Sequence, residues 1–398
     1  MNTHFNILVV GGGNAGISVA ARLHLQRRSL QIGVIEPSDK HYYQPAWTLV
    51  GGGQFNLADT VRTELSVIPK GVEWIKDAVT TFQPLQNQLT CASGQTYTYD
   101  YLITAPGIQL DWDKVAGLKE TLGKNGVCSN YSYEYASYTY ECIKNTKPGD
   151  VALFTSPATP VKCGGAPQKI MYMGADYFRR KGILDKVTVE FVSGGSVIFA
   201  IKRYADELMK LVKGYHIQLN FKHNLIAIDG ENKLATFQVA GSMGEQTVTS
   251  HFDMIHVTPP QSAPDFIKKS PLADAAGWID VDKYTLQHKR YPNIFGLGDA
   301  ANTPNSKTGA AVRKQAPVLV ANLLSLIDGK PLTARYNGYS SCPIIAGYGK
   351  LILAEFDYDN IPRETFPFNQ AKPRRSMWAL KKYVLPWLYW HKILKGTM

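Results

Sequence analysis

The chain has 398 residues, of which 44% are hydrophobic and 19% are charged. A chain of this length is too long to fold around one ordinary hydrophobic core, and this composition excludes a disordered or repetitive chain. We therefore expect two domains and an extension. The net charge of +11 falls to +4 without residues 372–398, which carry seven Lys or Arg and no Asp or Glu. The basic charge is therefore mostly local, and a nucleic-acid-binding protein is not expected.

The cysteines show neither C-x-x-C nor the spacing of a zinc site, so no metal centre is expected. In a chain this large, one redox-active pair of cysteines is a better interpretation than the disulfide framework of a secreted protein. The first strand begins within about five residues of Met1, so we expect no signal or transit peptide. No run of about 18 apolar residues predicts a membrane-spanning helix. The five cysteines are Cys91, Cys128, Cys142, Cys163 and Cys342.

A buried strand at residues 5–10 leads into a glycine-rich turn and a helix. Gly11, Gly13 and Gly16 satisfy the dinucleotide fingerprint G-x-G-x-x-G. The first glycine permits a tight turn, the second lets a pyrophosphate approach the backbone, and the third lets the helix pack closely. The N-terminus of this helix, which includes Ala15, offers free N–H groups to the phosphates. The sequence therefore predicts a dinucleotide site.

The rest of the first unit, to about residue 110, agrees with this prediction. A second strand at residues 31–35 ends in Glu36, which can accept hydrogen bonds from both hydroxyls of an adenosine ribose. An aromatic loop containing Gln44 follows, and then a short strand at 72–75 with its exit at 76–80, which includes Val79. An apolar strand from Tyr101 ends in a tight turn at Gly107.

A second nucleotide-binding unit is predicted between residues 111 and 290. A helix is expected over 141–145, and the strand–helix–strand pattern 151–154, 168–181 and 187–192 repeats the first unit. The turn at 155–165, however, carries prolines and Lys162 where glycines would be needed, and the second strand ends in Ser193 instead of an acid. We infer a nicotinamide-binding fold that has lost its nicotinamide and placed Cys163 in the vacated loop.

The chain then returns to the first unit through a strand at 291–297 that ends in Gly298-Asp299. In flavoproteins of this architecture such an aspartate holds the ribityl chain, and the next helix, over 309–327, aims its N-terminus at the flavin ring. Two nucleotide signals that flank an insertion predict FAD. The expected fold is α/β, with two Rossmann-like domains as in glutathione-reductase-like flavoproteins and a C-terminal extension. The expected divisions are 1–110 and 291–335 for FAD, 111–290 for the second domain, and 336–398 for a quinone and membrane-interface region.

The C-terminal stretch 378–395 interleaves tryptophans and leucines with lysines, which is typical of a helix at a lipid interface. We expect Pro386 to divide it into two short helical pieces. The alternatives are a tail packed on the protein's own surface and a dimer interface.

Several long strings resemble the sulfide:quinone oxidoreductase family, in the branch that includes the animal mitochondrial enzyme. The likeness covers almost the whole chain. The strings are 36–51, 159–163, 165–170, 256–260, 275–278, 339–343 and 353–358.

The resemblance implies an FAD enzyme that oxidises hydrogen sulfide, passes two electrons to membrane quinone and passes sulfane sulfur to a thiol, sulfite or similar acceptor. It implies a redox bridge, a disulfide or trisulfide, between Cys163 and Cys342, with attack by hydrosulfide at Cys342. Lys307 would stabilise the reduced flavin, and Ile344 and Phe356 are the expected quinone contacts. The implied FAD contacts are Gly11, Gly13, Ala15, Gly16, Glu36, Gln44, Val79, Gly107, Asp299, Lys307, Thr308, Gly309 and Ala310.

Other positions are weighed against the same pattern. Cys128 stands near a third functional cysteine of other bacterial branches, and we expect it to be a spectator, as are Cys91 and Cys142. Lys162 and the helix after Pro167 are candidates to stabilise a thiolate on Cys163.

Two other functions stay open: a single-subunit NADH:quinone oxidoreductase, and a sulfide or redox sensor without turnover. The expected location is peripheral, on the cytoplasmic face of a bacterial inner membrane, or on the mitochondrial inner membrane if a transit segment has been removed. A homodimer also stays open.

Overall fold

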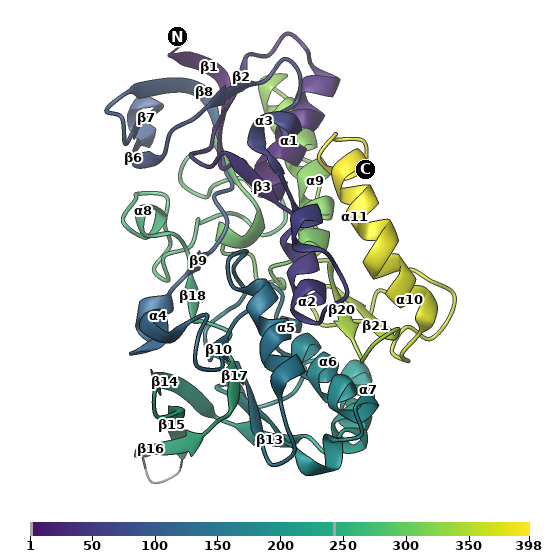
Figure 1. Cartoon of the computed structure of the whole chain (residues 1–398). Helices are drawn as coiled ribbons and strands as arrows, with labels where there is room; N and C mark the ends of the chain where they lie inside the picture. The colour runs from purple at the N-terminus through teal and green to yellow at the C-terminus, as the bar shows by residue number, and fades with distance from the viewer. Residues whose placement is uncertain (1–2, 242–243) are drawn as a thin grey trace.

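The computed structural model describes residues 3–241 and 244–398, and its largest sheet lies in the upper part of Figure 1. The strand order is β5-β2-β1-β8-β7-β6, and β19 pairs with β8 on the side of the path. Strands β2, β1, β8 and β19 run parallel. The bounds are β1 (His4–Val10), β2 (Ile32–Ile35), β5 (Glu73–Ile75), β6 (Val79–Gln83), β7 (Gln88–Cys91), β8 (Thr96–Thr104) and β19 (Ile294–Gly296).

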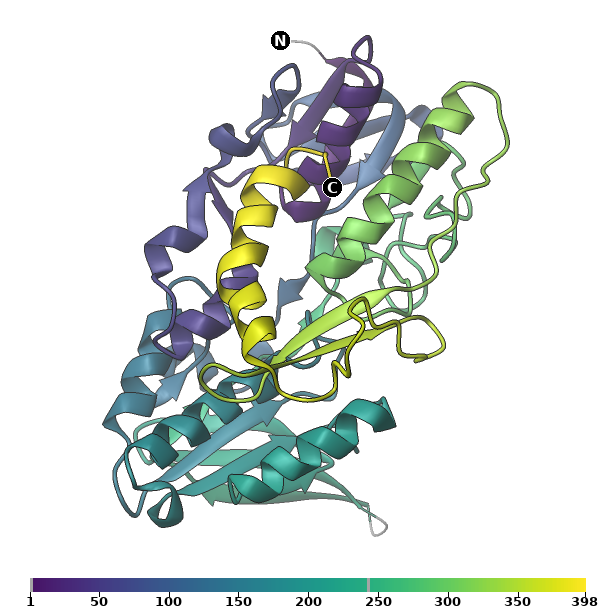
Figure 2. The same ribbon diagram turned by 90° about the vertical axis from the view of Figure 1, so that its right-hand side faces the viewer.

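The two predicted halves of the FAD unit meet in this sheet. Strand β19 lies nearly 200 residues after β8, yet Phe295 pairs with Ile103. Helices α1 (Asn14–Gln26) and α9 (Gly309–Ile327) pack side by side against the sheet, as Figure 2 shows. Because both helices begin at the carboxyl ends of β1 and β19, their N-termini face the same edge of the sheet.

A second, fully parallel sheet lies in the lower part of Figure 1, in the order β10-β17-β11-β12-β13. Its unit β11–α6–β12 confirms the predicted strand–helix–strand pattern. The strands are β10 (Val127–Cys128), β11 (Val151–Ser156), β12 (Thr188–Ser193), β13 (Gln218–Phe221) and β17 (Met254–His256). The helices packed with it are α5 (Ala136–Asn145), α6 (Ala166–Arg180) and α7 (Lys202–Gly214).

An antiparallel sheet of three strands covers another part of the second unit, and the sequence interpretation missed it. Its strands are β14 (His223–Asp229), β15 (Leu234–Gly241) and β16 (Gly244–His251). Shorter elements connect the two units, among them the pair β9 (Gln109–Leu110) and β18 (Gln261–Ser262). The remaining short elements are β3 (Lys40–Tyr42), β4 (Val61–Thr63), α2 (Trp47–Gly51), α3 (Glu64–Val67), α4 (Leu118–Thr121) and α8 (Asp265–Lys268).

The segment between the two units packs with the first sheet. Ile267, Leu272 and Ile279 share a core cluster with Phe5 and Leu102. The domain divisions at residues 110, 290 and 335 stay predictions.

The C-terminal region consists of a hairpin and a helix. Strands β20 (Ser340–Ile345) and β21 (Leu351–Phe356) pair antiparallel, and β20 packs against α6. Helices α10 (Arg375–Ala379) and α11 (Leu385–Leu388) belong to one continuous helical rod in Figure 2, joined and extended by the π-helical turns Leu380–Val384 and Tyr389–Ile393.

The prediction that Pro386 divides this helix is therefore wrong. Pro386 stands in the first turn of α11, where its missing N–H costs little. The Leu385 N–H donates to the Leu380 carbonyl, five residues back, so a wider turn precedes the proline. We attribute the continuity to this wider turn, which gives the proline ring room inside a helix.

Helix α9 is long enough and apolar enough, with a mean hydropathy of 1.2, to cross a bilayer by length and composition alone. Its residues Leu319, Val320 and Leu323 are buried in the core of the first unit. This packing is that of a core helix in a globular protein.

Candidate active site

Two cysteines from distant parts of the chain meet at the junction of the two units. Cys163 lies in the loop between β11 and α6, and Cys342 lies in β20, 179 positions later. Their sulfur atoms are 3.5 Å apart. A Cβ on Gly165 would lie 2.5 Å from the Cys342 sulfur, so only glycine lets the loop approach this closely. The Cys342 side chain is buried, with 1% of the residue exposed, whereas Cys163 is partly exposed.

The backbone of Cys163 also contacts the FAD unit. Its N–H donates to the Lys307 carbonyl at 2.7 Å, and its φ of +54° is left-handed. Such a conformation is uncommon for a residue other than glycine and is found where surrounding contacts hold it. The loop therefore places Cys163 beside the segment that leads into α9.

The cation beside Cys163 is Lys169, from the second turn of α6. Its Nζ donates to the Cys163 sulfur at 2.9 Å. The other candidate from the sequence, Lys162, points elsewhere, since its Nζ donates to the Gln44 Oε1 at 2.7 Å and lies over the Trp47 ring. Of the two candidates, the helix after Pro167 supplies the contact.

A second cation reaches the pair from the C-terminal helix. Lys381 is buried, and its Nζ donates to the Pro45 carbonyl at 2.7 Å. Burial, together with the neighbouring charge of Lys169, lowers the pKa of Lys381 to about 7, while the two cysteines act in the opposite direction.

The surroundings shift the pKa values of the two thiols in opposite directions. A hydrogen bond from Cys342, helped by the Lys169 ammonium, holds the pKa of Cys163 well below its usual range. The same hydrogen bond, together with burial, raises the pKa of Cys342 well above its usual range. The reduced pair therefore consists of a thiolate on Cys163 and a thiol on Cys342.

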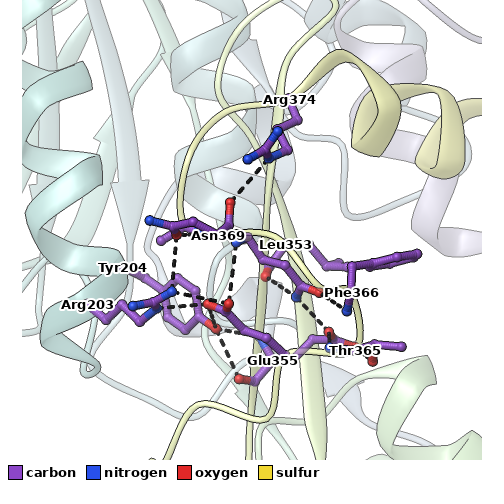
Figure 3. Close-up of polar contacts among 11 residues, drawn as sticks. Arg203, Tyr204, Leu353, Glu355, Thr365, Phe366, Asn369 and Arg374 are labelled. Carbon is purple, nitrogen blue, oxygen red and sulfur yellow. Dashed lines mark hydrogen bonds and ion pairs between the residues drawn. The ribbon is translucent and has the colours of Figure 1, made fainter.

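A buried carboxylate in the hairpin, that of Glu355 in β21, binds the segment that follows the hairpin (Figure 3). Glu355 follows Ala354, the strand partner of Cys342, and accepts from the Thr365 N–H and the Gln370 Nε2, at 2.8 and 2.7 Å. The Tyr339 hydroxyl also donates to it. With so many donors, the carboxylate is satisfied without a cation and fixes the returning segment on β21.

The glycine fingerprint forms an open cradle. Gly11 has φ +104°, and a Cβ there would lie 2.5 Å from the Ala105 carbonyl oxygen. A Cβ on Gly16 would collide with the Gly11 carbonyl oxygen, but one on Gly13 would meet no atom within 4 Å. This is the pattern that a bound pyrophosphate requires, with tight packing beneath the turn and free space at the second glycine.

The second half of the fingerprint lies directly beside this cradle. A Cβ on Gly298 would lie 3.2 Å from the Cβ of Ala15, and one on Gly309 would lie 3.4 Å from the Asn14 Nδ2. The structure therefore brings together the start of α1, the Gly298-Asp299 turn and the start of α9. The residues present fit FAD.

Charged groups in this region are strongly perturbed. Burial raises the pKa of Asp299, against the effect of Lys307 and Lys162. Burial lowers the pKa of Lys307 to about 8, and its Nζ donates to the Ala301 carbonyl at 2.9 Å. Thr308 caps α9 by accepting from the Ala311 N–H, and Ala310 follows in the first turn.

The other expected FAD contacts are spread around the same edge. Glu36 accepts from the Gly12 N–H at 2.8 Å, directly behind the cradle. Val79 is buried at the start of β6, and Gly107, with φ +80°, follows β8. Gln44 joins the region through Lys162. The roles of these residues stay predictions.

The two expected quinone contacts lie on the face of the hairpin that also carries Cys342. Ile344 is buried beside Gly165, and Phe356 packs edge-on against Phe199. Both side chains belong to the core of the second unit, and their contact with quinone stays a prediction.

Among the described residues, no group of three or more His, Cys, Asp or Glu could hold a metal ion. Cys128 donates to the Ile255 carbonyl and shares a hydrogen bond with Cys142, and all three predicted spectator cysteines are buried. Their inertness stays a prediction.

The sequence interpretation missed Lys169 and Lys381. Lys169 is itself buried, in a largely apolar run of α6, and a lone lysine in such a run is the one signal that could have found it. Lys381 carries no comparable signal, because it lies among other lysines in a tail that the pattern assigned to a membrane surface.

The comparisons with known proteins agree with this geometry. The family model for pyridine nucleotide-disulphide oxidoreductase matches residues 5–135. A relative from Dictyostelium discoideum, named mitochondrial sulfide:quinone oxidoreductase, is 50% identical over 98% of this chain and 86% of its own length. A relative of the same name from Mus musculus is 46% identical over 99% of this chain and 87% of its own length.

A solved structure points the same way. The sulfide:quinone oxidoreductase from Aquifex aeolicus superposes with a TM-score of 0.84, at 20% identity, over 99% of this chain and 92% of that chain. At this identity the likeness shows the fold alone, and the family follows from the relatives of higher identity. The chain belongs to the sulfide:quinone oxidoreductase family.

Proposed function

We propose that this chain is an FAD-dependent sulfide:quinone oxidoreductase whose working sulfurs are those of Cys163 and Cys342. The observation that carries the proposal is the meeting of these two sulfurs, 3.5 Å apart and 179 positions apart in sequence, next to the Lys307 segment of the FAD unit. The full-length relatives with this name support the activity.

When bound, FAD accepts two electrons from the sulfur pair and delivers them to quinone. We propose that the glycine cradle and Glu36 hold its adenosine diphosphate part and that Asp299 holds its ribityl chain. The N-terminus of α9, from Thr308 to Ala310, would lie against its ring. Lys307 supplies positive charge there.

The first chemical step takes place between sulfurs of the chain and substrate. Hydrosulfide attacks the Cys342 sulfur of the oxidised bridge, the bond to Cys163 breaks, and Cys342 carries the new persulfide while Cys163 leaves as a thiolate. A sulfur of low pKa leaves faster in such exchanges, and Lys169 lowers the pKa of Cys163. The geometry therefore favours Cys163 as the leaving group.

The sulfane sulfur must then leave Cys342, which is almost fully buried. We propose that a small nucleophile, a low-molecular thiol or sulfite, accepts it, because a bulky acceptor could not reach this sulfur. The acceptor takes the outer sulfur and the Cys342 thiol remains.

We also propose that the C-terminal helix attaches the enzyme to the membrane that holds its quinone. One side of this helix is buried against the protein, including Trp378, Tyr389 and Trp390. The opposite side exposes Tyr383 and Trp387, 64% and 52% exposed, and neighbouring lysines add positive charge. Exposed aromatic rings flanked by lysines suit an interface with anionic lipid.

The relatives from Dictyostelium and mouse are named mitochondrial, which supports membrane association in the same compartment for this chain. The cytoplasmic face of a bacterial membrane and a homodimer stay predictions.

The function is tested by an anaerobic titration of the purified flavoprotein with sulfide, followed by a soluble quinone. We expect sulfide to bleach the flavin and quinone to restore its absorbance. Cys163→Ser and Cys342→Ser should each abolish sulfide-dependent quinone reduction with FAD still bound. Full activity in either variant would contradict the mechanism.

The same titration separates the alternatives. An NADH:quinone oxidoreductase would be bleached by NADH and not by sulfide. The loop 155–165 argues against this function, since it has prolines where a nicotinamide site needs glycines. A sensor would react with sulfide once and show no turnover with quinone.

A further inference from the structure

A buried hydrogen bond joins the C-terminal helix to the first unit. The Tyr389 hydroxyl lies 2.6 Å from the Nε2 of His41. Only 5% of Tyr389 and 3% of His41 are exposed. Since His41 lies in β3, directly behind the glycine-rich turn, the end of the C-terminal helix contacts the FAD unit through one specific polar pair.

The other side of the imidazole contacts the turn itself. The Nδ1 of His41 lies 3.0 Å from the Gly12 carbonyl oxygen. A carbonyl oxygen can only accept, so the network assigns a proton to Nδ1. In the neutral ring Nε2 is then an acceptor, and the Tyr389 hydroxyl donates to it. The Tyr389 hydroxyl therefore satisfies the Nε2 atom of this tautomer and holds the ring with its Nδ1–H against the Gly12 carbonyl.

Holding the Gly12 carbonyl fixes the next peptide group. The Gly12–Gly13 bond is trans, so the Gly13 N–H points away from the side on which the carbonyl meets His41. Within the described residues no hydrogen bond satisfies this N–H, and a Cβ on Gly13 would meet nothing within 4 Å. The group is a free donor at the open part of the cradle.

Glu64 restricts the arrangement further. Its Oε2 lies 3.3 Å from the His41 Nδ1, and a Cβ on Gly12 would collide with its Oε1. This Oε1 is buried and has no hydrogen-bond partner among the described residues. The Gly12 N–H is held separately, by Glu36. Gly12 is thus fixed at both its N–H and its carbonyl, with Glu64 packed against its α-carbon.

We propose that Tyr389 is a positioning residue for FAD, because its hydrogen bond to His41 orients the Gly12–Gly13 peptide and so aims the Gly13 N–H at the cofactor's pyrophosphate. The inference rests on FAD as the cofactor of the proposed function. It gives the C-terminal helix a second task besides attachment to a membrane. Retention of FAD then depends on how this helix is seated.

The ring of Tyr389 has other contacts that would survive loss of its hydroxyl. It lies 4.7 Å from the Tyr43 ring, and the adjacent Trp390 stacks under the Arg62 guanidinium at 4.3 Å. Tyr389→Phe therefore removes the hydrogen bond and leaves the helix seated. Tyr383→Phe, on the exposed side of the same helix, is the matched control.

The test is the dissociation constant of FAD, measured by titrating FAD into the full-length apoprotein and following flavin fluorescence. We expect Tyr389→Phe to weaken FAD about tenfold, which corresponds to about 1.4 kcal/mol, with no change in Tyr383→Phe. A loss of less than about threefold in Tyr389→Phe, or equal losses in both variants, would overturn the proposal. Because no sulfide or quinone is present, the result does not depend on the redox function.

A second measurement separates positioning from general stability. The melting temperature of the apoprotein should be nearly the same in wild type and Tyr389→Phe, and the stabilisation on adding FAD should be smaller in the variant. His41→Asn should weaken FAD binding as well. The double variant should lose no more FAD affinity than the single variant with the larger loss, because the two residues act in one chain of bonds. Additive losses, or an apoprotein destabilised as much as the holoprotein, would contradict the proposal.

Discussion

The Lys169 ammonium lies 2.9 Å from the Cys163 sulfur, and both residues belong to the segment that enters α6. The sulfur in the loop before α6 therefore has its own cation, provided by that helix. Lys169 acts on Cys342 as well, but the hydrogen bond with Cys163, together with burial, raises the pKa of Cys342, so the two cysteines differ in their chemistry.

Replacing this cation should make Cys163 a weaker acid. In Lys169→Gln we expect the pKa of Cys163 in the reduced enzyme to rise, because the thiolate loses its ammonium partner. The measurement is the rate of alkylation by iodoacetamide against pH, whose midpoint should move to higher pH and whose rate at neutral pH should fall. Lys162→Gln is the control, since Lys162 points to Gln44. An unchanged midpoint in Lys169→Gln would show that Lys169 does not stabilise the thiolate.

Lys381 leads to a prediction about stability and pH. Its pKa is lowered to about 7 in the folded protein, against an ordinary value of 10.5. Between these values the unfolded chain binds more protons at this site, so this residue makes stability rise with pH from about 7 to about 10.5. In Lys381→Met that rise should be smaller.

Urea unfolding of wild type and Lys381→Met at about pH 7 and pH 9.5 measures this contribution. Lys382→Met serves as control for a lysine on the same helix. Equal changes of the unfolding midpoint with pH in wild type and Lys381→Met would rule out a depressed pKa at this position.

The sequence predicts the parts of the site that depend on local pattern. The fingerprint at Gly11, Gly13 and Gly16, the Gly298-Asp299 turn and helix α9 were each readable within a short window, because glycine spacing and strand hydrophobicity are local signals. The resemblance supplied the pairing of Cys163 with Cys342, which no local pattern contains.

The contributions of the C-terminal helix were not predictable in the same way. In the sequence, Lys381 and Tyr389 are two members of an amphipathic tail. Only the folded position of the C-terminal helix brings Lys381 near the cysteines and Tyr389 to His41. The helix also contains a π-helical turn before Pro386, and no residue pattern predicts such a turn. The roles of Lys381 and Tyr389 thus depend on contacts between segments distant in sequence, which a local pattern does not contain.

The glycine cradle separates folding from cofactor binding. Gly13→Ala adds a methyl group where no atom of the protein lies within 4 Å, and the φ of −71° at this residue suits alanine, so the apoprotein should fold normally. Its FAD affinity should fall strongly, because the methyl group occupies the approach of the pyrophosphate. Gly16→Ala should instead destabilise the apoprotein, because its methyl group collides with the Gly11 carbonyl. Apoprotein melting and FAD titration check both variants, and normal FAD binding by Gly13→Ala would contradict the placement of the cofactor.

The exposed side of the C-terminal helix provides the last prediction. Trp387 and Tyr383 project from the side opposite the buried Trp390, so their replacement should leave folding and FAD content unchanged. If this side enters a lipid interface, Trp387→Ala combined with Tyr383→Ala should lose about tenfold or more in binding to vesicles that contain anionic lipid, because two interfacial rings are removed. Co-sedimentation with vesicles measures this binding. The control is Leu85→Ala, which replaces an exposed apolar residue of the first unit that is distant in sequence from the C-terminal helix. If the double variant sediments with vesicles as the wild type does, the exposed rings contact another partner, such as a second copy of the chain. Light scattering of the protein without vesicles would reveal such a dimer.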